Sequence, residues 1–191
     1  MANSPEKDEA RRGRRWRIAA WAMAAGLLLL PWVAMRFTKG IVWDETDFIF
    51  AGALIGGIGV TFELTVRTTR NNAYRAGVAA ALAASFLLVW INAAVGMIGS
   101  EDNPLNLIFA GVLAIALLGA ILARFRAEGM ARAMMAAAIA QVLAGAVGTF
   151  TDVRGGILSA IFAAPWLLSA ALFGKAPRAD SGEANSPHRP A

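Results

Sequence analysis

Glu63 and Arg67 are the residues whose type and spacing come closest to a chemical site in this sequence. Glu63 is the one acidic residue inside a long apolar stretch, and a carboxylate within a membrane segment is a candidate carrier of protons or cations. Arg67 follows four residues later, so both side chains share one face of a helix. Two interpretations remain open: a local ion pair at the membrane interface, or a proton or cation site.

Asn92 and Gln141 are amide side chains inside other apolar stretches. They either hydrogen-bond between neighbouring helices or contribute to a path for a solute. The chain has no cysteine, and its one histidine, His188, lies in a polar tail. Cys/His metal sites and thiol or histidine-activated nucleophiles are therefore excluded from the apolar region. We expect no cofactor, no metal site and no enzymatic activity.

The composition is that of an integral membrane protein. Of its 191 residues, 58% are hydrophobic and 16% charged, and the mean hydropathy is +0.55. At about 1.5 Å per residue, six stretches can cross roughly 30 Å of hydrocarbon: 18–35, 48–66, 76–98, 105–123, 133–150 and 157–173. They lack the alternation of barrel strands, so we predict an all-α bundle of six transmembrane helices over residues 16–174. The polar ends, 1–15 and 175–191, are predicted to be disordered.

Residues that cap or interrupt helices mark several of these stretches. We expect Thr46 and Asp47 to cap the start of the second helix, and Asn103 followed by Pro104 to open the fourth. Gly155 and Gly156 precede the sixth stretch. Pro31 and Pro165 could kink the first and sixth helices. No stretch shows a clear break in the middle of the membrane.

Basic residues fall almost entirely on one side of this topology. All but three of the 18 lysines and arginines lie on the side of the N-terminus, and the exceptions are Arg36, Lys39 and Arg154. The positive-inside rule then places both termini in the cytoplasm. The net charge of +5 suits the membrane surface, and we expect no nucleic-acid partner. A cleaved signal peptide is disfavoured because the first apolar run is long and lacks a good cleavage site.

Glycines on the second stretch form a nearly bare helix face. Gly52, Gly56 and Gly59 are spaced by three or four residues and share that face with Glu63 and Arg67. A bare face lets a neighbouring helix approach closely. Comparable faces are Ser85, Asn92 and Gly96 on the third stretch, and Gln141, Gly145, Gly148 and Asp152 on the fifth. We predict that the three faces meet in the interior of the bundle.

Two pairs of stretches share short sequences. Ile-Phe-Ala-Gly occurs at 49–52 and at 108–111, and Arg-Ala at 75–76 and 132–133 precedes an alanine-rich helix in both cases. One interpretation is a parallel repeat of two helical hairpins, formed by helices 2–3 and 4–5. The other is a chance likeness between alanine-rich helices.

The run VGMIGSEDNPLNL, residues 95–107, resembles a stretch in a family of small, uncharacterised six-span proteins of proteobacterial inner membranes. The likeness extends to Trp43, to Phe62-Glu63-Leu64 and to Tyr74-Arg75, and it covers roughly residues 40–125. The resemblance implies a location and a fold. It implies no activity.

Three classes of function compete. The first is a non-enzymatic membrane module that binds membrane-protein partners, lipid or a second copy of itself within the bilayer. We favour it because the predicted helices have glycine-lined faces and short loops. The alternative is a small transporter or channel for a cation, a proton or a small molecule, favoured by Glu63, Asn92 and Gln141. An intramembrane enzyme is least favoured, because one intramembrane carboxylate without histidine or cysteine builds neither a protease dyad nor a metal site.

Overall fold

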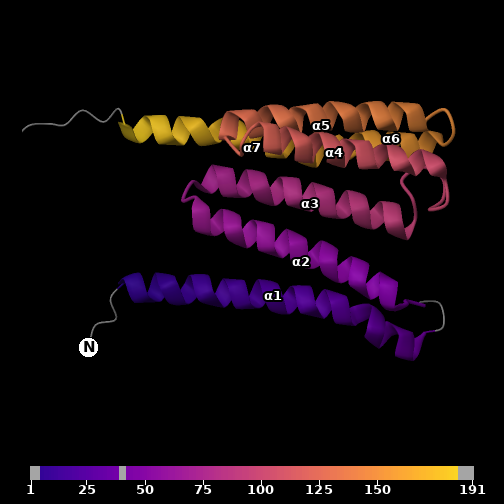
Figure 1. The fold of residues 1–191 in the computed structure, drawn as a ribbon, viewed down its shortest axis with the longest axis horizontal. Helices are drawn as coiled ribbons and strands as arrows, with labels where there is room; N and C mark the ends of the chain where they lie inside the picture. Colours follow the sequence, from indigo (N-terminus) through magenta and orange to yellow (C-terminus); the bar gives the residue numbers. More distant parts are fainter. Residues whose placement is uncertain (1–4, 39–41, 185–191) are drawn as a thin grey trace, which may run out of the picture. The chain divides into compact units, whose positions relative to one another are not determined.

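The computed structural model describes residues 5–38 and 42–184, and the elements in those ranges are all helices. In chain order they are α1 (Pro5–Phe37), α2 (Glu45–Thr68), α3 (Asn72–Ala94), the short 3-10 helix η1 (Pro104–Leu107), α4 (Ile108–Leu122), α5 (Ala127–Gly148), α6 (Val153–Ile161) and α7 (Ala163–Ala184) (Figure 1). Six segments are long and apolar enough to cross a membrane: Arg17–Phe37, Glu45–Thr68, Asn72–Ala94, Pro104–Leu122, Ala127–Gly148 and Val153–Ala176. The predicted all-α fold with six membrane-spanning segments is confirmed.

The chain divides into two compact units, residues 1–61 and 62–191, and each is described by itself. In the first unit, α1 packs against the N-terminal part of α2. A Cβ added to Gly59 would lie 2.9 Å from Cη2 of Trp21, and one added to Gly52 would lie 3.9 Å from Cδ2 of Leu28. Since the later glycine meets the earlier α1 residue, the two helices run antiparallel.

The start of α2 differs in detail from the prediction. Asp44 precedes the helix, and its carboxylate accepts a hydrogen bond of 3.0 Å from the Asp47 backbone N–H. The Asp47 carboxylate accepts one of 3.0 Å from the Asp44 backbone N–H in return. This reciprocal pair satisfies two backbone donors at the end of the helix. Asp44 is therefore the cap, and the assignment of that role to Thr46 was wrong.

In the second unit, α5 and α7 lie at the centre. The helix α5 packs against α4, α6 and α7, while α7 also packs against α3 (Figure 1). Large side chains that are at most 1% exposed fill the space between them: Leu88, Phe109, Trp166 and Phe173. Smaller residues let the backbones approach, as at Gly77, where an added Cβ would lie 3.1 Å from the Phe173 ring.

The closest approach in this unit is between α5 and α6. A Cβ on Gly145 would lie 2.6 Å from the backbone nitrogen of Ala160 and 2.6 Å from the carbonyl oxygen of Gly156. A Cβ on Gly156 would lie 2.5 Å from the backbone nitrogen of Thr149. In lipid, where no hydrophobic effect drives helices together, such close backbone packing supplies the attraction.

The sixth span is broken in its middle, which corrects the expectation of six uninterrupted helices. The helix α6 ends at Ile161 and α7 begins at Ala163. Pro165 has no N–H to bond the carbonyl of Ile161, so a regular helix cannot continue through this point. The Phe162 N–H bonds instead to the carbonyls of Leu158 and Ser159, both at 3.2 Å. Pro31, by contrast, lies inside α1 without ending it.

The starts of η1 and of the sixth span, and the outer ends of α1 and α7, can be compared with the predictions. Asn103 caps η1, and Pro104 follows it as predicted. The sixth span begins earlier than predicted: Asp152 is its cap, and Gly155 and Gly156 lie in its first turn. The helices α1 and α7 begin at Pro5 and end at Ala184, and the predicted disorder of residues 1–15 and 175–191 stays a prediction.

Residues 1–4, 39–41 and 185–191, which include Lys39 and His188, lie outside the described residues. The boundaries of the transmembrane domain at residues 16 and 174 stay predictions. The internal repeat also stays a prediction.

Substitution of Gly145 tests the close packing of α5 on α6. We expect Gly145→Ala to lower the free energy of unfolding by about 1–3 kcal/mol, because the new methyl group meets backbone atoms that cannot rotate away. The measurement is thermal unfolding of the purified protein in detergent. Gly111→Ala is the control, since an added Cβ there meets no atom within 4 Å. Equal midpoints for Gly145→Ala and the parent would contradict this packing.

Candidate functional site

The candidate site is a cluster of amide and hydroxyl side chains at one end of the second unit, where the chain leaves α3. Asn106, at the end of η1, is its centre and is 5% exposed. Its Oδ1 accepts hydrogen bonds from the backbone N–H groups of Met97 (3.1 Å) and Ile98 (2.9 Å). Its Nδ2 donates to the carbonyl of Ser100 at 2.7 Å. One side chain thus satisfies three backbone groups of a loop that has no regular structure.

Two further asparagines also hold this loop in place through hydrogen bonds. Asn92, near the end of α3, donates through Nδ2 to the carbonyl of Asn106 at 3.1 Å. Asn103 donates through Nδ2 to the carbonyl of Ile98 at 3.0 Å. Gly96 gives the loop the space it needs: its φ is +74°, and a Cβ there would lie 2.7 Å from Nδ2 of Asn106. A left-handed φ with no room for a side chain selects glycine.

Gln141 reaches the same cluster from α5. It is fully buried, and its Nε2 donates to the carbonyl of Ser159 at 3.0 Å, close to the break between α6 and α7. The Ser159 hydroxyl donates to the carbonyl of Met97 at 3.4 Å. Asn92 and Gln141 are therefore linked through Asn106, Met97 and Ser159, and the polar faces predicted on the third and fifth helices share one network.

Three buried polar atoms of the described residues have no hydrogen-bond partner: Oδ1 of Asn92, Oε1 of Gln141 and Nε1 of Trp166. Burying such a group unpaired costs about 1–3 kcal/mol. Each of the two amides nevertheless uses its N–H₂ group to satisfy a backbone carbonyl. Each of these carbonyls also accepts a backbone N–H, that of Ile108 at Asn106 and that of Phe162 at Ser159. The amides therefore add hydrogen bonds between separate segments of the chain.

Asp152 ties the loop to the junction of α5 and α6. Its Oδ2 accepts from the Gly99 backbone N–H at 3.2 Å and its Oδ1 from the Arg154 backbone N–H at 3.1 Å. Hydrogen bonds from the N–H groups of Gly155 and Gly99, with a further contribution from Arg154, hold the pKa of Asp152 below its ordinary value. This carboxylate is thus stabilised in its charged form and acts as a structural clasp.

Glu63 and Arg67 lie away from this cluster. Arg67 donates to Oε1 of Glu63 through Nη2 at 2.8 Å and Nε at 3.1 Å. The arginine is 62% exposed and the glutamate 17%. Arg75 bonds the carbonyls of Val66 and Thr69, both at 2.7 Å, which places this end of α2 beside the start of α3. Asn92 lies near the far end of α3, so Glu63 and Arg67 are not brought together with Asn92 and Gln141.

The predicted glycine face of α2 meets α1 at two of its three glycines. Gly59 faces Trp21 and Gly52 faces Leu28, as described above. The close approach expected at Gly56 is not found among the described residues, since an added Cβ there meets no atom within 4 Å.

Sequence reasoning missed Asn106, Ser159, Ser169 and Trp166. Ser169 is fully buried, and its hydroxyl donates to the carbonyl of Gly77 at 2.8 Å, joining α7 to α3. A signal was present for Ser159 and Trp166: residues 156, 159, 163, 166, 170 and 173 are spaced by three or four and carry small, polar or aromatic side chains. That spacing marks one helix face, and it is the face that α6 and α7 bury.

Acidification tests the Asp152 clasp. The pKa is lower in the folded than in the unfolded state, so the carboxylate stabilises the fold above about pH 3.9, and this contribution is lost as the pH falls through the folded-state value. Asp152→Asn still caps α6 but cannot titrate. Its thermal midpoint should therefore fall less than the parent's between about pH 5 and about pH 3. Asp102→Asn is the control and should follow the parent, and identical profiles for all three proteins would refute the clasp.

Among the described residues, no three His, Cys, Asp or Glu side chains come together as a candidate metal site. Comparison with protein-family models, with curated proteins and with solved structures finds no match. The structure is that of a multi-pass membrane bundle, and a cluster of polar side chains holds the loop after α3 against one end of the second unit.

Proposed function

We propose that the protein is a non-enzymatic membrane module that binds a membrane-protein partner or lipid through its outward apolar faces. The observation that carries this proposal is the use made of its intramembrane polar groups. Asn92 and Gln141 bond backbone carbonyls of the same unit, and Glu63 forms an ion pair with Arg67. The N–H₂ groups of both amides and the carboxylate of Glu63 are thus engaged within the bundle, and the acceptor oxygens of the two amides are buried.

An outward recess supports the idea of a docked partner. It has a volume of about 200 Å³ and lies beside the break in the sixth span, between α5 and α7. The described residues that line it are all apolar: Ala138, Ile139, Val142, Leu143, Ala163 and Leu167. These positions fall near the middle of both spans, where apolar side chains of a neighbouring transmembrane helix would lie.

We further propose that the membrane is a bacterial inner membrane and that both termini are cytoplasmic, as the likeness of residues 95–107 and the basic residues favour. In the second unit, the Tyr74 hydroxyl donates to the carbonyl of Phe125 at 2.7 Å and Nδ2 of Asn71 to that of Ala176 at 3.0 Å. The α2–α3 loop, the α4–α5 loop and the end of the sixth span therefore share one end of this unit. That end carries Arg70, Arg75, Arg124, Arg126 and Lys175, as the positive-inside rule requires of a cytoplasmic face.

Photo-crosslinking tests the docked partner. Leu143 lines the recess and Leu117 lies on α4, and both are 61% exposed. A photoreactive residue at position 143 should give a discrete protein adduct in native membranes. The same residue at position 117 should give lipid adducts only. Adducts that do not differ between the two positions would contradict docking at the recess.

A transporter or channel is the second candidate, and the broken sixth span favours it. Interrupted helices near the middle of the membrane are typical of transporter binding sites, and the Gln141 amide bonds Ser159 beside this break. One observation argues against this candidate. The Oε1 atom of Gln141 is buried, so water or a solute does not reach the amide in this structure.

A flux assay separates the two candidates. We expect proteoliposomes containing the parent to show no proton or cation flux above that of empty vesicles. Glu63→Gln should leave folding intact, because an exposed ion pair is worth about 0–1 kcal/mol. Flux in the parent that disappears in Glu63→Gln or Gln141→Leu at equal protein density would overturn the module in favour of transport.

A further inference from the structure

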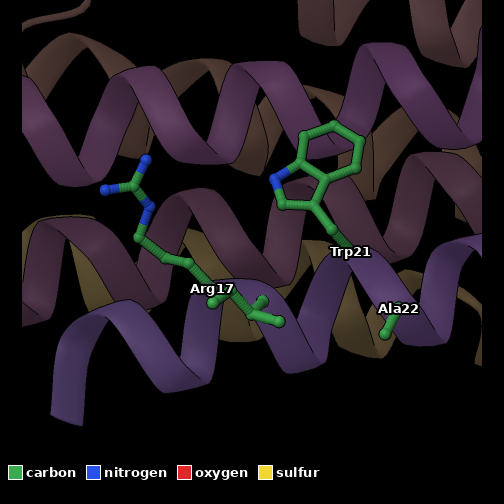
Figure 2. A pocket seen from close by; sticks show the side chains of 4 residues that line it. Arg17, Trp21 and Ala22 are labelled. Atoms are coloured by element: carbon green, nitrogen blue, oxygen red, sulfur yellow. The ribbon is translucent and has the colours of Figure 1, made fainter. Parts of the chain in front are cut away.

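A hollow on α1 has the dimensions of a ligand site. Its volume is about 660 Å³, and Arg17, Ile18, Trp21 and Ala22 line it. Small-molecule sites in proteins measure about 300–1,000 Å³. Figure 2 shows the guanidinium of Arg17 and the indole of Trp21 projecting from the same side of α1, one turn apart.

The lining of this hollow is charged at one end and apolar along the rest. The guanidinium has five N–H donors in a planar fork, which match two oxygens of a phosphate and leave donors for other partners. Ile18, Trp21 and Ala22 offer the apolar surface that a glycerol backbone and the first methylene groups of an acyl chain need. A ligand that carries a negative phosphate next to hydrocarbon fits both parts.

The apolar wall is held in place by the neighbouring helix. An added Cβ on Gly59 would lie 2.9 Å from Cη2 of Trp21 and 3.3 Å from its Cζ2 and Cζ3. The indole therefore rests directly on the bare backbone of α2. Because the ring is positioned before a ligand arrives, binding does not have to order it.

The depth of the hollow also suits a phospholipid. Arg17 is the first residue of the first membrane-spanning segment, and the sequence before it contains Arg11, Arg12, Arg14 and Arg15. Tryptophan is enriched at the level of the lipid headgroups, and basic segments next to a span attract anionic lipids. The guanidinium is thus expected at the level of the phosphates and Trp21 one turn deeper.

The other end of α1 carries the same pair of residue types in a different arrangement. There the guanidinium carbon of Arg36 lies 4.9 Å from the centroid of the Trp32 ring, a cation–π contact. The two side chains are four residues apart at both ends, but at this end they stack on each other. Arg36 is therefore a matched control for Arg17.

From these observations we propose that Arg17 and Trp21 form a site for one anionic phospholipid, with the phosphate on the guanidinium and the acyl chain along Ile18 and the indole. The inference deepens the proposed function, because it names a lipid class that the module binds. It is independent of the protein partner at the recess between α5 and α7.

Native mass spectrometry of the full chain, released from detergent with added lipid, tests the site. Phosphatidylglycerol and phosphatidylcholine with identical acyl chains are the probes. We expect the parent to retain one phosphatidylglycerol in preference to phosphatidylcholine. Arg17→Gln should lower that retention about tenfold, as for the loss of one charge-assisted contact. Arg36→Gln should leave it unchanged.

A second variant tests the hollow without removing the arginine. Ile18→Glu places a carboxylate beside the guanidinium and should abolish the preference for the anionic lipid, and Ile18→Gln should keep it. Equal retention of both lipids by the parent, or equal losses in Arg17→Gln and Arg36→Gln, would overturn the site. Inorganic phosphate that displaces the lipid completely at millimolar concentration would show a site for a free anion and overturn the lipid assignment.

Failure of this inference can be told apart from failure of the proposed function. If phosphatidylglycerol is not preferred but the discrete adduct at position 143 persists, the lipid site is refuted and the module stands. If the adduct at position 143 is missing while the lipid preference depends on Arg17, the lipid site is supported and the docked protein partner is refuted.

Discussion

The structure depends on one constraint: inside a membrane, each backbone N–H and C=O group needs a partner within the protein. Regular helices meet this requirement by themselves, which is why the six spans are helical. The sixth span does not, because Pro165 removes a donor in its middle. The carbonyl of Ile161 thereby loses its helical donor. Beside this break, the carbonyl of Ser159 accepts from both the Phe162 N–H and Nε2 of Gln141. The buried amide therefore joins α5 to the interrupted span.

The same constraint explains the loop after α3. Residues 95–103 have no regular structure, yet the backbone groups of Met97, Ile98 and Ser100 are satisfied by the single side chain of Asn106. Ser159 then joins the loop to the broken span through the carbonyl of Met97. A network of this kind makes the loop part of the bundle instead of a flexible connection, because releasing it would leave several buried groups unpaired at once.

Dense packing in the second unit bears on function as well. Where Gly145 and Gly156 bring α5 and α6 together, backbone meets backbone, and no space remains there for a solute. The open surfaces lie outside this contact, at the recess between α5 and α7 and at the hollow on α1. The recess is lined by apolar residues, and the hollow, on the side of α1 where Trp21 contacts Gly59, adds one guanidinium. Recognition at such surfaces requires neighbours that share the membrane, namely helices and lipids.

The sequence by itself determined the number of spans and their helical nature, because length and apolar composition leave no other structure in lipid. The local pair of Glu63 with Arg67 and the cap at Asn103 were also predictable, since both involve residues close in the chain. Only the tertiary structure decided what Asn92 and Gln141 do, because their partners are the carbonyls of Asn106 and Ser159, 14 and 18 residues away. Pro165 allowed a kink in the sixth helix to be predicted, but the contact of Trp21 with Gly59 was decided only by the tertiary structure. Contacts of this kind depend on how backbones from distant parts of the chain meet, and residue spacing along one helix carries no record of that.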